Sequence, residues 1–340
     1  MKKIMVIGAG GIARSVHFPS LRDIIKESGN IEITAVCDLI EERAKSGAAY
    51  FGDKTKWGLS YLNMIDEHKP HAVFLLTQPD QSYRMSVECI KRGIDVFCEK
   101  PAGATLFQLK SLERMIRDSN VIYQVGFNRR YIPLVKEIYR IMKDTTPITQ
   151  VSGCFYKNGT SAFFNGAAGA LESDVIHVMD LLCMFAGAAA SSARTVAANI
   201  NSEIDNAWNS VLRFENGTMG VIKSNYQTGG RVHLFEIHGP KASAYINLGF
   251  GTASCDAKII FFGGKESYSL ASTGTLYDNI GHFDGMDISG SKEMYRFYGY
   301  YDEDREFIDC IHTRKTPGAN IYEAINAMGM SDLIRNGVFN

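Results

Sequence analysis

The sequence predicts two domains: a doubly wound α/β domain with a parallel sheet, followed by an α+β domain built on a largely antiparallel sheet. Three observations lead to this fold class. The chain has 340 residues, which is too long for a single domain with one hydrophobic core. Short apolar runs alternate with helical patterns up to residue 125, as in βαβ units. Alternating strand-like runs dominate the later part. We therefore place the first domain at residues 1–125 and the second at residues 126–340.

The first domain contains a series of short apolar strands separated by helices. The predicted strands are Ile4–Ile7, Ile31–Cys37, Ala72–Thr77, Val96–Cys98 and Val121–Val125. Ala72–Thr77 is continuously apolar, which is typical of a parallel strand buried on both faces. A helix is predicted over Glu41–Phe51, and Asp80 is the expected cap of another. Thr105 and Gln108 form a capping box that starts a further helix.

The second domain combines a few helices with many strands. Helices are predicted at Leu134–Met142, Val175–Phe185, Asp302–His312 and Tyr322–Asn336. Two strands flank Asn216-Gly217, a dipeptide that favours a hairpin because it accepts positive φ. Residues 263–290 are rich in Gly, Ser and Asp, so we expect a loop there.

Composition excludes several classes of partner and location. The formal net charge is −1 and no run of Lys or Arg stands out, which argues against nucleic acid. The seven cysteines are scattered without a C-x-x-C pair, as expected in a reducing compartment. His177 and Asp180 interrupt the longest apolar helical stretch, and no signal-peptide pattern is present. We expect a cytoplasmic protein that does not bind membranes.

A glycine motif after the first strand predicts a dinucleotide site. Its residues are Gly8, Gly10, Gly11, Ile12 and Ala13, in a G-x-G-x-x-A pattern between a strand and a helix. Gly8 permits a tight turn, Gly10 lets backbone approach a pyrophosphate, and Ala13 allows close helix packing. The helix N-terminus supplies N–H donors to the anion. This is the fingerprint of a Rossmann domain.

Asp38, at the end of the second strand, favours NAD over NADP. Its carboxylate can bind both ribose hydroxyls and would repel a 2′-phosphate, for which only Arg43 is a candidate donor nearby. The alternative is that Asp38 only caps the next helix. Thr77 and Pro79 lie at the carboxyl end of the Ala72–Thr77 strand, at the edge where such sheets bind ligands, although Pro79 could equally be a loop proline before a helix.

Glu99-Lys100-Pro101 follows the Val96–Cys98 strand and carries the first chemical candidate. Because a residue before proline avoids the helical region, the Lys100 side chain should leave the strand at the coenzyme edge. A partly desolvated lysine there can donate or accept a proton. We therefore include Glu99 and Lys100 among the expected coenzyme contacts, although most lysines are only solvated surface charges.

Four motifs in order make the chain similar to the Gfo/Idh/MocA family, named for glucose–fructose oxidoreductase and inositol dehydrogenase. They are Val6–Ala13, Glu99–Pro101, Val125–Tyr131 and Ile176–Asp180. The resemblance implies a C-terminal domain with a large open antiparallel sheet, assembly into dimers or tetramers, and NAD(P)-dependent oxidation or reduction of a secondary alcohol or ketone carbon in a sugar, cyclitol or sugar derivative.

The resemblance also assigns roles to individual residues. Lys100 and His177 match the lysine and histidine that flank the reacting carbon. The family's aspartate one turn before the histidine has no direct match: Ser173 stands at that position, and Asp174 lies three residues before His177, where it can still neighbour the ring. We expect His177 to act as general base oriented by Asp174, and Lys100 to stabilise charge on the oxygen.

Alternatives remain for these residues and for the whole chain. His177 could be a hydrogen-bonded core residue. Asp174, His177 and Asp180 share a helix side, but we expect no metal, because the nicotinamide and Lys100 supply the needed chemistry. Asn128, Arg129 and Tyr156 are further candidates for substrate contact. A non-catalytic sensor of coenzyme or sugar, and a reductase of a non-carbohydrate carbonyl or dihydrodiol, are the rival functions.

Overall fold

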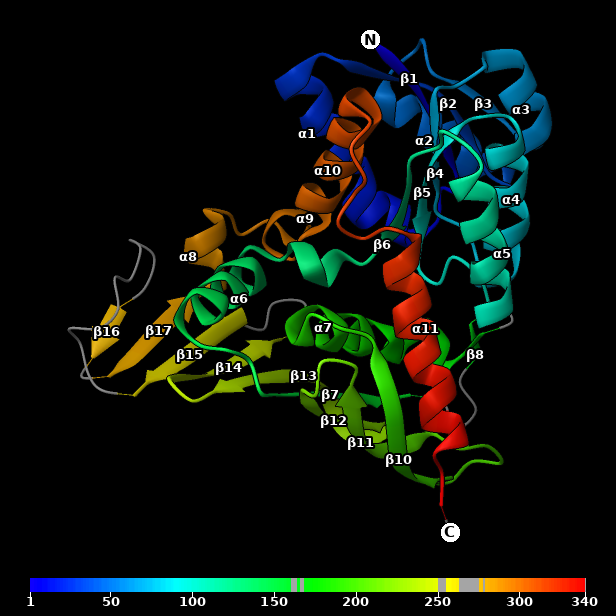
Figure 1. The fold of residues 1–340 in the computed structure, drawn as a ribbon. Helices are drawn as coiled ribbons and strands as arrows, with labels where there is room; N and C mark the ends of the chain where they lie inside the picture. The colour runs from blue at the N-terminus through cyan, green and yellow to red at the C-terminus, as the bar shows by residue number, and fades with distance from the viewer. Residues whose placement is uncertain (160–163, 166–167, 250–254, 263–274, 278, 340) are drawn as a thin grey trace. The chain divides into compact units, whose positions relative to one another are not determined.

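The computed structural model describes residues 1–159, 164–165, 168–249, 255–262, 275–277 and 279–339, which form two compact units (Figure 1). The first unit consists of residues 1–128, 165–168 and 299–325, and the second of residues 129–164, 169–298 and 326–340. The first unit thus takes up a segment from late in the chain. The domain boundary at residue 125 stays a prediction.

The first unit is built on a parallel six-stranded sheet, as the sequence predicts. The strand order is β3-β2-β1-β4-β5-β6. The strands are β1 (Lys2–Ile7), β2 (Ile31–Cys37), β3 (Lys56–Gly58), β4 (Ala72–Leu75), β5 (Asp95–Glu99) and β6 (Tyr123–Gly126). Both neighbours of β1 pair with it in parallel, so the order turns back at β1 and the carboxyl ends of the strands share one edge.

Helices cover both faces of this sheet, with α1 and α10 on one side and α4 and α5 on the other in Figure 1. The helices are α1 (Phe18–Ser28), α2 (Glu41–Phe51), α3 (Tyr61–His68), α4 (Pro79–Lys91), α5 (Leu106–Arg117) and α10 (Tyr300–Thr313), with α11 (Ile321–Asn336) leaving the unit. A π-helical segment, Ala13–His17, precedes α1.

Two helix starts test the predicted caps. Thr105 accepts from the Gln108 N–H at 3.3 Å, as expected at the start of α5, while Gln108 Oε1 accepts from the Ala104 N–H at 2.7 Å. The cap predicted at Asp80 is wrong, because α4 begins at Pro79 and its N-cap residue is Gln78. Proline suits the first helical position, since the N–H that it lacks would have no intrahelical partner there.

The core of the first unit joins its sheet to α10. Phe74 and Phe97 stack with ring centroids 4.8 Å apart, and Phe307 of α10 packs edge-on against Phe74 at 5.3 Å. All three side chains are fully buried. Because burying such an aromatic side chain contributes about 1.5–3 kcal/mol, this contact fixes α10 against β4 and β5.

The second unit is built on a nine-stranded, mostly antiparallel sheet, also as predicted. The order is β10-β11-β12-β7-β13-β14-β15-β17-β16, and only the pair of β7 with β12 is parallel. The strands are β7 (Gln150–Asn158), β10 (Ala190–Ala198), β11 (Ala207–Phe214), β12 (Met219–Asn225), β13 (Gln227–Gly239), β14 (Ala242–Leu248), β15 (Cys255–Phe261), β16 (Thr275–Tyr277) and β17 (Ile280–Asp284). Two short strands, β8 (Phe164–Asn165) and β9 (Ala168–Gly169), form a separate sheet.

The turn between β11 and β12 has the predicted form, with Gly217 at φ 87°. The loop expected over residues 263–290 is only partly correct. Residues 263–274 and 278 lie outside the described residues, and β16, β17 and the short helix α8 (Gly285–Ser289) occupy most of the remainder. β17 pairs with β15, so tertiary pairing overrides the weak strand propensity of this segment.

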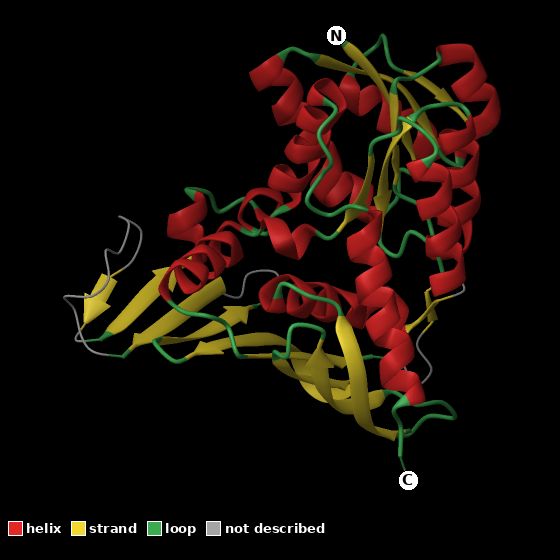
Figure 2. Cartoon of the chain, in the orientation of Figure 1, coloured by secondary structure: helices red, strands yellow, loops and turns green. Residues whose placement is uncertain are grey.

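Two helices pack on one face of this sheet, which we call the inner face. They are α6 (Pro133–Thr145) and α7 (Ile176–Ala186), seen beside the sheet in Figure 2. A π-helical segment (Leu171–Val175) leads into α7, a short 3₁₀ helix (Asn128–Tyr131) precedes α6, and α9 (Met294–Phe297) follows α8. A Cβ at Gly153 of β7 would lie 2.6 Å from Val178 Cγ1 of α7, so glycine permits close contact there.

Two further features bear on the expectations. All seven cysteines fall within the described residues, are buried and are free thiols. Across the parts of the chain that the structure covers, we find no helix with the length and apolar character needed to cross a membrane.

Candidate active site

The glycine loop after β1 has the geometry of a dinucleotide-binding turn. Gly8 has φ 98°, and a Cβ there would lie 2.3 Å from the Leu76 carbonyl oxygen, so only glycine fits. Around Gly10 and Gly11, by contrast, an added Cβ would meet no atom within 4 Å. The chain therefore passes an open space, and its backbone is accessible to a ligand.

The loop then runs into the π-helical segment before α1. Ala13 is fully buried at its start, whereas Ile12 is 39% exposed. Burial of the small Ala13 allows this segment to pack closely, as the motif predicts. N–H groups at the start of a helical segment attract anions, so the loop fits a pyrophosphate.

Asp38 lies directly beside the glycine loop. Its Oδ2 accepts from the Ala9 N–H at 2.8 Å, and its Oδ1 accepts from the Ile40 N–H at 2.9 Å. It does not cap α2, whose N-cap is Ile40. Each carboxylate oxygen retains acceptor capacity, so Asp38 can still bind the two hydroxyls of a ribose.

A pocket of about 300 Å³ connects these features within the first unit. Gly8, Gly10, Asp38, Arg43 and Thr77 line it, as do Leu59, Tyr61 and Met85, which sequence reasoning did not select. Its volume is at the lower end of the range for small-molecule sites. The mixture of a carboxylate at one end and apolar walls suits an adenosine, so the residues present fit NAD.

Thr77 and Pro79 follow β4 and take different roles. Thr77 lines the pocket, and its buried hydroxyl has no hydrogen-bond partner among the described residues. Such a group is expected where a ligand or water completes the bonding. Pro79 is buried as the first residue of α4, which supports the structural alternative; its coenzyme contact stays a prediction.

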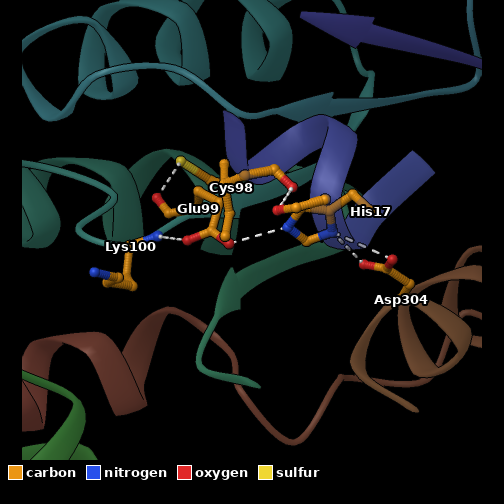
Figure 3. Close-up of polar contacts among 7 residues, drawn as sticks. His17, Cys98, Glu99, Lys100 and Asp304 are labelled. Atoms are coloured by element: carbon orange, nitrogen blue, oxygen red, sulfur yellow. Dashed lines mark hydrogen bonds and ion pairs between the residues drawn. The ribbon is translucent and has the colours of Figure 1, made fainter. Parts of the chain in front are cut away.

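Glu99, Lys100 and Pro101 end β5, and the Lys100–Pro101 bond is cis. Glu99 turns away from the Lys100 side chain and toward His17 (Figure 3). Glu99 Oε1 lies 3.0 Å from His17 Nε2, and Glu99 Oε2 accepts from the Lys100 N–H at 3.1 Å. Glu99 therefore fixes the backbone of Lys100; its coenzyme contact stays a prediction.

His17 links β5 to α10 in a buried polar cluster, which we call the His17 cluster: His17, Glu99, Glu303 and Asp304. His17 Nδ1 lies 2.9 Å from Asp304 Oδ1 and 3.2 Å from its Oδ2. Burial alone would lower the pKa of His17, but the charges and hydrogen bonds of Asp304 and Glu99 outweigh burial and hold this pKa well above its ordinary value. His17 is therefore an imidazolium that donates to two carboxylates.

Glu303 completes the His17 cluster as a neutral group. Burial, followed by the nearby charge of Glu99, raises the pKa of Glu303 well above its usual range. Ligand atoms of His17, Glu303 and Asp304 lie within 4.8 Å of one another, as a metal site would require. Both nitrogens of His17 already donate to Asp304 and Glu99, so hydrogen bonding accounts for these three residues, whereas the Glu303 oxygens have no hydrogen-bond partner among the described residues.

In the second unit, Asp174 and His177 lie at the junction of the π-helical segment and α7. The π-helical turn is a departure from the single α-helix predicted, and such turns occur often at functional sites. The exposed fractions of Asp174 and His177 are 8% and 6%. Asp174 Oδ2 accepts from Lys157 Nζ at 2.9 Å and from the Tyr226 hydroxyl at 3.1 Å. Orientation of His177 by Asp174 stays a prediction.

Asp180, the third residue of the possible metal triad, is bound by a guanidinium instead. Arg130 Nε lies 2.8 Å and 2.7 Å from its two oxygens, and Arg130 Nη2 lies 2.7 Å from Oδ1. Both side chains are buried. Asp180 therefore anchors α7 to the segment after β6.

The three predicted substrate residues are placed differently. Asn128 is buried at the start of the 3₁₀ helix. Arg129 is 3% exposed; its Nη2 lies 3.4 Å from His233 Nδ1. Tyr156 pairs with Val232, which is 37% exposed, so strand alternation directs Tyr156 to the face opposite His233. The structure thus does not bring Tyr156 to the inner face with Arg129.

Other residues of the inner face were not selected from the sequence. Phe155 and Lys157 of β7, Tyr226, and Arg231 and His233 of β13 lie around Arg129 and Asp174. The sequence does contain a pattern that indicates them. On β13, Arg231 and His233 alternate with other residues and lie on the same face as buried Phe235. Strand periodicity separates the two faces, but it does not indicate which one a helix covers.

Comparisons with known proteins agree with this architecture. Residues 2–127 match a family model described as an oxidoreductase family with an NAD-binding Rossmann fold, and residues 149–245 match a GFO/IDH/MocA C-terminal domain. A scyllo-inositol 2-dehydrogenase (NAD(+)) of Bacillus subtilis is 22% identical over 322 residues, which span 90% of this chain and 86% of that protein. An inositol 2-dehydrogenase of Salmonella typhimurium is 25% identical over 184 residues, 53% of each chain.

Solved structures share the whole fold. A dehydrogenase (MviM) from Clostridium difficile superposes with a TM-score of 0.79 at 20% identity, covering 99% of both chains. A levoglucosan dehydrogenase in complex with NADH and levoglucosan gives a TM-score of 0.81 at 16% identity, covering 99% of this chain and 96% of that one. At these identities the structural likeness concerns the fold alone.

Proposed function

The chain belongs to the Gfo/Idh/MocA family of NAD-binding oxidoreductases, and from this premise we propose that it moves a hydride between NAD and a secondary alcohol carbon of a sugar, cyclitol or sugar derivative. One observation carries the proposal. The glycine loop, Asp38 and the Glu99-fixed backbone of Lys100 lie at the carboxyl ends of β1, β2 and β5, which are strands of one parallel sheet. That edge is where such sheets bind nucleotides and carry out chemistry.

The chain's own residues hold the coenzyme in distinct ways. Within the Gly8–Ala13 loop, the N–H groups of Gly8 and Ala9 already donate to the Cys37 carbonyl and to Asp38, so the pyrophosphate would be held by the N–H groups from Gly10 onward. Asp38 would bind the adenosine ribose. The carboxylate of Asp38 also disfavours the 2′-phosphate of NADP. Bound NAD supplies a two-electron acceptor in the oxidising direction and a donor in the reverse direction.

Two side chains manage the proton and the charge. When the alcohol is oxidised, its carbon gives up a hydrogen with two electrons and its hydroxyl gives up a proton, leaving a ketone. His177 accepts the hydroxyl proton at a ring nitrogen. Lys100 holds its ammonium at the oxygen and stabilises the charge that develops there. Asp174, held by Lys157 and Tyr226, is the positioning residue for His177.

Lys100→Met and His177→Ala test these roles. Each variant should lower kcat/KM by about 10²- to 10⁴-fold, because each removes one positioned proton or charge group. Coenzyme affinity, measured by NADH fluorescence, should stay within about twofold for His177→Ala, whereas Lys100→Met should still bind NADH but more weakly, because Lys100 is also an expected coenzyme contact. The controls are Lys110→Met and His312→Ala, which change exposed residues of the first unit and should leave both values unaltered.

The assay should include sugars, cyclitols, sugar acids and a small aromatic diol. Normal turnover by both variants would reject the assigned roles. A diol oxidised faster than every sugar would replace the carbohydrate by a non-carbohydrate substrate.

We further propose that two or four copies associate through the outer face of the nine-stranded sheet. Val211, Met219, Leu234 and Tyr245 are between 43% and 62% exposed there, and apolar surface of this kind often marks an interface. Light scattering should give a dimer or tetramer. The double variant Leu234→Lys/Tyr245→Lys should dissociate it, and a monomeric parent protein would reject the assembly.

A cytoplasmic location is also proposed, supported by the seven buried thiols.

A further inference from the structure

The inner face of the second unit buries hydrogen-bond donors that the chain does not satisfy. Arg129 Nε and Nη1 are buried and have no hydrogen-bond partner among the described residues, and the same is true of His233 Nε2. Among the described residues, the Arg129 side chain makes one hydrogen bond, a long one of 3.4 Å from Nη2 to His233 Nδ1. Buried polar groups are nearly always paired in folded proteins, so each exception calls for an explanation.

All three unmatched groups are hydrogen-bond donors. The two Arg129 nitrogens always carry hydrogen, and the tautomer of His233 places its proton on Nε2. Burial, reinforced by the charges of Arg129, Arg231 and Lys157, lowers the pKa of His233 far below its ordinary value, so the ring is neutral. Because its Nδ1 accepts from Arg129, its proton lies on Nε2. The unmatched set is therefore two guanidinium N–H groups and one imidazole N–H, without an unmatched acceptor among them.

Positive charge is concentrated around the same point. The guanidinium carbons of Arg129 and Arg231 lie 6.0 Å and 5.7 Å from the centre of the Phe155 ring. His233 packs on that ring at 4.4 Å. Lys157, two residues after Phe155 on the same face of β7, adds a third cation. We call Arg129, Lys157, Arg231 and His233 the donor cluster.

Asp174, the carboxylate that Lys157 bonds, does not neutralise Arg129. Asp174 is bonded to Lys157 and Tyr226, and none of the described residues gives Arg129 a carboxylate partner. A buried guanidinium without a counterion is unfavourable unless something else brings negative charge. A carboxylate or phosphate does so, and either anion accepts two parallel hydrogen bonds from one guanidinium.

We propose that the donor cluster binds an anionic group of the substrate, a carboxylate or a phosphate, so that the enzyme acts on a charged sugar in preference to its neutral parent. This inference deepens the proposed function and depends on it for the identity of the bound molecule as a substrate. The cluster is also connected to the proposed chemistry within the unit, because Lys157 bonds Asp174, three residues before His177.

Binding without turnover tests the site separately from the reaction. With NADH saturating, so that no oxidation occurs, D-glucuronate, D-glucose 6-phosphate and D-glucose are each titrated into the protein by calorimetry. At least one anionic ligand should bind ten-fold or more tightly than glucose, and the better anion identifies carboxylate or phosphate as the preferred group. Equal or weaker binding of both anions would overturn the proposal and would assign water to the unmatched donors.

Substitutions of Arg129 and His233 test whether their side-chain nitrogens cause the preference for an anionic sugar. Arg129→Met should abolish the preference for an anionic sugar over glucose, and His233→Phe should reduce this preference partially. Arg129→Lys keeps a charge but loses the planar fork, so it should restore part of the preference and serves as the folded substitute if Arg129→Met is unstable. Arg140→Gln, at an exposed position of α6, is the matched control and should bind as the parent does.

Turnover separates the two proposals. If an anionic sugar binds in an Arg129-dependent manner but no NADH forms from NAD across the substrate panel, the donor cluster stands and the dehydrogenase function fails. If neutral sugars are oxidised with kcat/KM equal to that of anionic sugars, and Arg129→Met does not change this ratio, the function stands and the anion site fails.

Discussion

The two units each bury a cluster of polar side chains, and the clusters differ in how donors and acceptors are matched. In the His17 cluster, both ring nitrogens face carboxylates at 2.9–3.0 Å, and Glu303, whose oxygens have no hydrogen-bond partner among the described residues, is kept neutral by burial. In the donor cluster, Arg129 and His233 present three N–H groups that no described residue accepts. Burial alone therefore does not mark a binding site, whereas an excess of one hydrogen-bonding type does.

Two adjacent arginines show the same difference within one unit. Arg130 holds Asp180 with its guanidinium, and both side chains are buried. Arg129 is more deeply buried, but its guanidinium hydrogen-bonds only a neutral imidazole among the described residues. Arg130 therefore serves the fold, and we infer that Arg129 serves a ligand.

The largest expected effect on stability comes from His17→Ala. Removing the imidazolium leaves Glu99 and Asp304 buried without their counterion, which should cost about 3–5 kcal/mol. Urea unfolding followed by circular dichroism measures this loss. The exposed His312→Ala should change stability by less than about 0.5 kcal/mol. A loss below about 1 kcal/mol for His17→Ala would show that the His17 cluster is not a matched ionic network.

The two arginines give the next test. Arg130→Met removes the guanidinium that bonds both oxygens of buried Asp180, so it should destabilise the protein by about 3 kcal/mol. Arg129→Met removes a cation that has no counterion and should change the free energy of unfolding by less than about 1 kcal/mol in either direction. Equal losses for the two variants would contradict the assignment of one arginine to the fold and the other to a ligand.

The pH dependence of stability should be smaller. The His17 cluster favours low pH, whereas buried His233, whose pKa is lowered, acts with the opposite sign below about pH 6.5. His17 has a raised pKa when folded, so its contribution is complete below its unfolded pKa of about 6.5 and is lost as pH rises through the folded value. Glu303 acts with the same sign, because the folded chain retains a proton that the unfolded chain has released. Each group gives at most about 1.4 kcal/mol per pH unit.

Unfolding measured between pH 5 and pH 9 checks this slope. The cost of His17→Ala should shrink as pH rises, and Glu303→Gln should gain stability relative to the parent at pH 8 compared with pH 5. A stability difference between parent and His17→Ala that does not vary with pH would refute the charged form of His17.

Local patterns in the sequence predicted much of the fold. The first strand, the glycine loop and Asp38 follow from short-range chemistry, and they form as expected because one turn and one strand end position them. The capping box at Thr105 and the Asn216-Gly217 hairpin are equally local. β17 was missed because its pairing with β15, rather than its own composition, makes it a strand.

Polar contacts between residues far apart in the chain could not be predicted from the sequence. His17 and Asp304 are 287 positions apart, and nothing local indicates that α10 returns to the first unit. For the same reason Glu99 was expected to face only the coenzyme, although its carboxylate bonds His17. Arg129 was selected as a candidate, but its difference from Arg130 depends on Asp180 and His233, which lie on distant segments.

The central claim is hydride transfer from a sugar carbon to NAD, and an isotope measures it most directly. The parent protein is incubated with NAD and with sugars, sugar acids and sugar phosphates deuterated at their secondary alcohol carbons, and the coenzyme is analysed by mass spectrometry. We predict deuterium in the reduced coenzyme, lost in Lys100→Met although that variant still binds NADH. Bound coenzyme and bound sugar with no deuterium transferred from any substrate would contradict the account.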